Sequence, residues 1–181
     1  GTTSSGRYRS ALLNARPDAR IDVILAAEPD AALPRGVGLS DFHGVVVGGS
    51  SLRADDAPTD RRVSDQVDLV RQALTAGLPV LGSCWGLQVA AMAAGGRVAA
   101  NPLGREIGIA RKLALTPAGR GHPLFDGKAA VFDSFCVHYD EVTHLPPGAV
   151  VLAANAHSAI QAACLDFGEG GRPGSFWGVQ Y

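Results

Sequence analysis

The chain has 181 residues, of which 46% are hydrophobic, and a formal net charge of −1 from 16 basic and 17 acidic side chains. This length and composition predict one domain, residues 1–181, with a substantial core. The balanced charge argues against nucleic acid or an anionic membrane as a partner. Three cysteines at irregular spacing argue against a disulfide framework and favour a reducing, cytoplasmic compartment. No apolar run approaches the ~20 residues of a membrane span.

The first half of the chain alternates between strand-like and helix-like segments. In chain order we expect the end of a helix at residues 7–13, strands at 21–25 and 44–48, a helix at 58–76, a strand at 78–83 and a helix at 85–94. The segment 44–48 is short, apolar and closed by glycine, which predicts a strand buried on both faces. In the helix at 58–76, Val63, Val67, Val70 and Leu74 recur at helical spacing. The alternation predicts a three-layer α/β fold, with a mostly parallel central sheet and helices on both faces.

The second half reads as hairpins and edge strands attached to that sheet. The predicted strands are residues 106–115, 129–137, 149–154, 158–165 and 175–180, separated by glycine and proline turns such as 146–148. They predict a smaller antiparallel sheet beside the parallel one.

The segment 80–88 carries the strongest functional signal. An apolar strand runs into Gly82-Ser-Cys84-Trp-Gly86 and then into an apolar helix, which is the form of a nucleophile elbow. The two glycines leave room for close backbone approach, and the helix N-terminus favours a thiolate and so a lowered thiol pKa. Most cysteines are instead buried core residues, and we expect this of Cys136 and Cys164.

A second glycine-bearing turn is expected on the same rim. Gly48-Gly49 follows a predicted buried strand, as Cys84 does, and ligands of open α/β sheets bind beyond the carboxyl ends of the strands. We therefore expect the two turns to share one site.

Five stretches together resemble one family. They are residues 48–51, the nucleophile motif 82–88, Gly104-Arg-Glu-Ile-Gly108, the segment 137–149 that begins Val-His-Tyr-Asp-Glu-Val, and Trp177-Gly-Val-Gln-Tyr181. In this order they resemble the class I glutamine amidotransferases, of the stand-alone type similar to the glutaminase domain of GMP synthase. The resemblance implies a flavodoxin-like fold and hydrolysis of glutamine or a γ-glutamyl compound through a thioester, with release of ammonia and glutamate.

The resemblance also implies roles for individual residues. The Cys84 thiolate would attack the side-chain amide, and the backbone N–H groups of Gly49 and Trp85 would form the oxyanion hole. Substrate-binding residues are expected to be Gln88, Ser51, Val137, His138 and Tyr139, the last three through their main chain. For Gln88 the alternative is an amide on the helix surface, and for Glu106 a structural role is favoured.

The family's catalytic histidine and the glutamate that orients it are expected just beyond Tyr181, and its first strand before Gly1, so the sequence looks cut at both ends. None of the five histidines is expected to replace that base, although His138 is the most suggestive. The histidines and cysteines show no metal-ligand spacing, and no nucleotide-binding motif is visible. We therefore expect no metal, no cofactor and no ATP site.

Two other interpretations stay open. One is a non-catalytic binding or regulatory module that keeps the fold but lacks a working triad. The other is an α/β-hydrolase with a cysteine nucleophile, which would need Asp133 or Asp140 together with His157. In the enzyme interpretation, a synthase or acceptor subunit is a possible partner, because no acceptor site for ammonia is visible in this chain.

Overall fold

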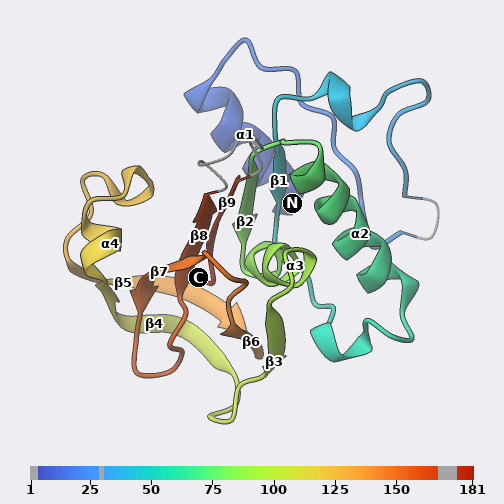
Figure 1. Ribbon diagram of the computed structural model, residues 1–181. Coiled ribbons are helices and arrows are strands. Elements are labelled where there is room, and N and C mark those ends of the chain that lie inside the picture. The colour runs from blue at the N-terminus through green and yellow to red at the C-terminus, as the bar shows by residue number, and fades with distance from the viewer. Residues whose placement is uncertain (1–3, 29–30, 167–174) are drawn as a thin grey trace.

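The computed structural model describes residues 4–28, 31–166 and 175–181, which form a curled seven-stranded sheet, a two-stranded sheet and several helices (Figure 1). The helices are α1 (Ser4–Ala15), α2 (Arg61–Thr75), α3 (Trp85–Ala93) and α4 (Pro117–Arg120), with 3₁₀ turns η1 (Leu39–Asp41), η2 (Ala54–Asp56) and η3 (Pro123–Phe125). The strands are β1 (Val45–Val47), β2 (Val80–Ser83), β3 (Arg97–Ala100), β4 (Glu106–Leu115), β5 (Val131–His138), β6 (Asp140–His144), β7 (Val150–Ala154), β8 (Ala162–Asp166) and β9 (Ser175–Val179).

The large sheet combines a parallel and an antiparallel part, in the order β1-β2-β9-β8-β7-β4-β5. The β1–β2 and β2–β9 pairs are parallel, and the remaining pairs of this sheet are antiparallel. Strands β3 and β6 form the separate antiparallel sheet. The mixed α/β fold with a smaller antiparallel sheet is confirmed. Its parallel part is confined to β1, β2 and β9, and the hairpin strands continue the same sheet.

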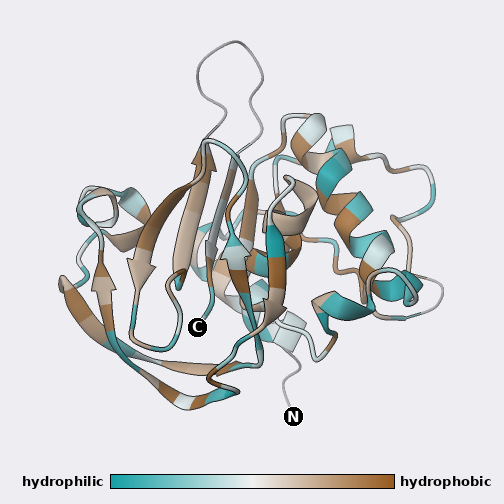
Figure 2. Cartoon of the chain, turned by 60° about the horizontal axis from the view of Figure 1, so that its bottom comes forward, coloured by the Kyte–Doolittle hydropathy of each residue, from teal (hydrophilic) through white to brown (hydrophobic). Residues whose placement is uncertain are grey.

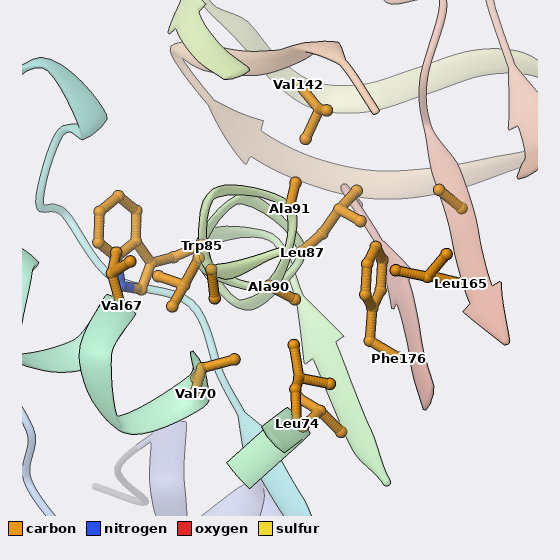
Figure 3. Packing of buried hydrophobic residues seen from close by; sticks show 14 of the residues in the cluster. Val67, Val70, Leu74, Trp85, Leu87, Ala90, Ala91, Val142, Leu165 and Phe176 are labelled. Carbon is orange, nitrogen blue, oxygen red and sulfur yellow. The ribbon is translucent and has the colours of Figure 1, made fainter. Parts of the chain in front are cut away.

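Helix α2 is amphipathic, as its spacing predicts, and its four predicted apolar positions are all buried. Hydrophobic and hydrophilic residues both occur along this helix in Figure 2, as expected of an amphipathic helix. It begins three residues later than expected because the Asp60 side chain caps it, accepting a hydrogen bond from the Arg62 N–H at 2.9 Å. Helix α3 is buried almost all round, and Figure 3 shows it between the core side chains of α2 and those of Leu165 and Phe176.

The expected strand at residues 21–25 does not form, and this prediction is wrong. A cavity of about 840 Å³ lies between this segment, α1 and β1, and Leu12, Ile24 and Val46 are among the residues lining it. The segment lines this cavity together with β1, and it pairs with no strand of the described residues. The same cavity leaves Val46 37% exposed, so β1 is not buried on both faces as predicted.

Strands β3 and β6 were not predicted from the sequence. Each is short, and they pair only with each other, Val98 opposite Val142. Among the helices described, none has both the length and the hydrophobicity needed to traverse a bilayer.

Candidate active site

Cys84 occupies the bend between β2 and α3 in a strained backbone conformation. Its φ is 54° and its ψ −107°, a region that residues with a side chain rarely adopt. Glycine is required on either side of Cys84, because a β-carbon at Gly82 or Gly86 would overlap backbone atoms. A β-carbon at Gly82 would lie 2.4 Å from the Gly86 carbonyl carbon, and one at Gly86 would lie 2.0 Å from the carbonyl oxygen of Val47. The predicted elbow is therefore present in the backbone.

The carboxyl ends of the three parallel strands meet at this bend. Strand β1 leads into Gly48-Gly49, β2 into Cys84 and β9 into Gln180. A β-carbon at Gly49 would lie 3.8 Å from the Cβ of Cys84, and the Cys84 N–H donates to the Val179 carbonyl at 2.7 Å. The expectation that the diglycine turn and Cys84 share one rim is confirmed.

The Cys84 sulfur is held by neutral groups. Its thiol donates to the Val137 carbonyl at 3.5 Å, and the Gln180 side-chain Nε2 donates to the sulfur at 3.7 Å. Burial raises the pKa of the Cys84 thiol above its ordinary value, while the Trp85 backbone N–H and the Gln180 side chain act in the opposite direction. The prediction that this pKa is lowered is wrong. Burial raises the pKa more than the donors at the helix N-terminus lower it, and among the described residues no cation contacts the sulfur.

Gln88 is buried at 3% exposure, so the helix-surface alternative is wrong. Its Nε2 donates to the Asp140 carbonyl at 2.8 Å and to Oε1 of Gln180 at 3.2 Å. Direct contact between Gln88 and a substrate stays a prediction. The substrate would have to compete for a side chain already engaged with its neighbours.

The expected substrate-binding segments lie around this sulfur. Val137 and Tyr139 are exposed, and the Val137 carbonyl faces Cys84 from the end of β5. Ser51 is also exposed, two residues after the glycine that adjoins Cys84. Trp85 is 2% exposed and donates its Nε1–H to the Gln66 side chain at 3.0 Å, so its ring is a packing group. The substrate roles of Ser51, Val137 and Tyr139 stay predictions.

His138 is buried with both ring nitrogens engaged. Its Nε2 lies 2.8 Å from Oε2 of Glu106, and its Nδ1 lies 3.1 Å from the Asp140 carbonyl. Asn155 and Gln161 also donate to Glu106, at 2.7 Å each. Burial raises the pKa of Glu106, but the hydrogen bonds from these three side chains outweigh it, so the pKa lies below its ordinary value. His138 therefore has no nitrogen free to take a proton from Cys84, and Glu106 anchors a structural network.

The remaining candidates are placed elsewhere. Cys136 and Cys164 are buried, as expected of core residues. His157 directs its Nε2 toward the Gly104 carbonyl at 3.1 Å, while Asp140 accepts from the Ala54 N–H at 3.0 Å. Asp133 accepts from the Lys112 N–H at 2.7 Å and pairs with Arg111. The α/β-hydrolase interpretation requires an Asp–His pair beside Cys84, and the candidates named for it form none among the described residues.

One residue beside the sulfur was missed, Gln180. A signal existed for Gln180, because alternation along β9 places it on the same face as Phe176 and Gly178, which are buried against α3. The sequence offers Asp140 only as the acid of an α/β-hydrolase, and its position beside η2 and Gln88 depends on contacts far apart in the sequence.

A family model described as "Glutamine amidotransferase class-I" matches residues 18–181. The chain belongs to the class I glutamine amidotransferase family. A glutamine amidotransferase of known structure from Thermotoga maritima has the same fold. It superposes with a TM-score of 0.76 at 20% identity, over 95% of this chain and 67% of that one.

Two relatives match different shares of this chain. A γ-glutamyl-L-1-hydroxyisopropylamide hydrolase from a Pseudomonas species is 35% identical over 185 residues, which cover 100% of this chain and 59% of that protein. A glutamine-hydrolysing GMP synthase from Thermomicrobium roseum is 37% identical over 133 residues, which cover 74% of this chain and 21% of that protein. The chain thus spans less than two thirds of the length of either relative.

Proposed function

We propose that this chain carries the nucleophile of a cysteine hydrolase that cleaves the side-chain amide of glutamine or of a γ-glutamyl amide. The observation that carries the proposal is Cys84 itself. It sits with a positive φ at a strand-to-helix bend, beside the Gly49 turn and at the start of α3. A buried core cysteine would have no reason to occupy such a strained position.

The reaction would proceed through a thioester. The Cys84 thiolate attacks the amide carbon, and the carbonyl becomes an oxyanion held by the N–H groups of Gly49 and Trp85. Each such donor typically contributes about 10²–10³ in kcat. The C–N bond then breaks, and the nitrogen leaves with a proton as ammonia or as an amine. Water hydrolyses the thioester to glutamate and regenerates Cys84.

A general base is needed, because burial keeps the thiol protonated. His138 is occupied on both nitrogens and cannot serve. We propose that the base is a histidine that directly follows Tyr181, oriented by a glutamate beyond it, as the family pattern implies. If the extended backbone of β9 continues, that position faces the same side as Gln180, toward Cys84.

The substrate's α-amino and carboxylate groups would contact Ser51 and the main chain at Val137–Tyr139, and Gln88 would hydrogen-bond the substrate. The Pseudomonas relative matches the whole chain, and its name specifies a γ-glutamyl amide. This supports γ-glutamyl amides of small amino alcohols as substrates to test beside glutamine. If glutamine is the substrate, ammonia would pass to a synthase or acceptor subunit.

The test uses the full-length protein and measures glutamate released from glutamine and from γ-glutamyl alkylamides, alone and with a synthase encoded beside it. We expect turnover that Cys84→Ala abolishes and that Cys164→Ala, a buried cysteine away from the bend, retains. An electrophilic analogue of glutamine should label Cys84. If no substrate is turned over and Cys84 is not labelled, the non-catalytic binding module becomes the better explanation.

A further inference from the structure

Gln180 is a fully buried polar side chain in contact with the candidate nucleophile. It is 0% exposed, and its carboxamide lies between the Cys84 sulfur and the side chain of Gln88. Its backbone is fixed on both sides. The Gln180 N–H donates to the Gln161 carbonyl at 2.8 Å, and the carbonyl of the preceding Val179 accepts from Cys84 at 2.7 Å. The strand therefore aims this side chain at the elbow.

The orientation of the Gln180 amide is determined by a chain of hydrogen bonds. The Asp140 carbonyl can only accept, so the Gln88 group facing it at 2.8 Å is the Nε2 donor. The same Nε2 donates to Gln180 at 3.2 Å, so the Gln180 atom on that side is the Oε1 acceptor. The Nε2 of Gln180 is then left facing the sulfur at 3.7 Å. A flipped amide would place two donors against each other.

The two hydrogen bonds of the Cys84 sulfur have opposite effects on its protonation. The Val137 carbonyl accepts from the thiol and so favours the protonated form. The Gln180 N–H donates to the sulfur, and such a bond strengthens when the sulfur becomes an anion. The Cys136 thiol on β5 also interacts electrostatically with Cys84. Burial, followed by the Glu106 charge, raises the pKa of Cys136 to about 11, so Cys136 stays neutral at neutral pH.

We propose that Gln180 is a positioning residue that favours the Cys84 thiolate by donating its carboxamide N–H to the sulfur, in an orientation set by Gln88 and the Asp140 carbonyl. This deepens the proposed function and rests on Cys84 being the nucleophile. It also links the segment 137–139, where the substrate is expected, to the reactivity of the sulfur through the adjoining Asp140 carbonyl.

The test measures the rate of Cys84 alkylation by iodoacetamide against pH in the full-length protein, read from the modified peptide by mass spectrometry. Gln180→Leu removes the donor at similar size, and Gln180→Glu replaces it with a carboxylate, a polar group of the same length. The matched control is Gln161→Leu, a fully buried glutamine whose side chain contacts Glu106 and Asn155 and not Cys84.

We expect the midpoint of alkylation to rise by about one pH unit in Gln180→Leu and further in Gln180→Glu, with no shift in Gln161→Leu. Unchanged midpoints in both folded Gln180 variants would overturn the proposal, as would an equal shift in the control. If one variant does not fold, the other decides. Alkylation requires no turnover, so a shifted midpoint in a protein that hydrolyses nothing would reject the proposed function and leave only the contact of Gln180 with the thiolate established.

Discussion

A methyl group added at Gly86 tests the close packing that holds Cys84 in place. The β-carbon of Gly86→Ala would lie 2.0 Å from the Val47 carbonyl oxygen, 2.8 Å from its carbonyl carbon and 3.0 Å from its Cβ, whereas ordinary contact begins at 3.4 Å. The nearest atoms belong to the backbone of β1, so no side-chain rotation relieves the overlap. Either α3 or β1 must move, and overpacking of this kind costs about 1–3 kcal/mol.

We expect Gly86→Ala to lower the free energy of unfolding by about 2–3 kcal/mol, measured by urea denaturation, with a fall in Tm of roughly 5–10 °C. The matched control is Gly121→Ala. Its β-carbon would meet nothing within 4 Å and its φ is −96°, so its effect should stay within about 0.5 kcal/mol. If Gly86→Ala proved as stable as the control, the elbow would not be packed against β1 as described.

Two further predictions concern buried polar groups. Glu106 carries a pKa below its ordinary value, so its ionised form stabilises the fold fully above pH ~4.3, and this contribution is lost as the pH falls through the lower folded-state value. Glu106→Gln should therefore unfold more easily at neutral pH and show a flatter loss of stability on the acid side, and an unchanged acid limb would contradict this. Trp85→Phe leaves the buried oxygen of Gln66 without its donor and should cost about 1–3 kcal/mol. The double variant Trp85→Phe/Gln66→Leu should lose less stability than the two single variants combined, and strict additivity in this double-mutant cycle would refute the coupling.

The spacing of hydrophobic residues was sufficient to predict an element where that spacing matched the buried face of the element. The helical spacing of the apolar residues in α2 predicts its buried face, because one stripe of that helix packs on α3. The segment 106–115 matches β4 to the residue, and the strand at 175–180 matches β9 to within one. The pattern failed at residues 21–25, because a β-branched run becomes a strand only when a neighbour lies within hydrogen-bond reach.

The small sheet was missed for a related reason. The pairing of β3 with β6 joins segments separated by about 40 residues, and neither segment alternates clearly enough to signal a strand. The sign of the Cys84 pKa shift was also beyond the sequence. A helix N-terminus can be read locally, but the burial that opposes it is a property of the assembled core.

For the site, the sequence by itself determined the elbow, since the requirement for glycine on either side of Cys84 is local and steric. It also placed the Gly49 turn on the same rim, because parallel strands bring their carboxyl ends together. Only the tertiary structure decided what surrounds the sulfur. The curl of the sheet brings Val137, from the edge strand β5, within 3.5 Å of Cys84, and Gln180 arrives from 96 residues further along the chain. Such contacts depend on how the whole sheet bends, which no local period encodes.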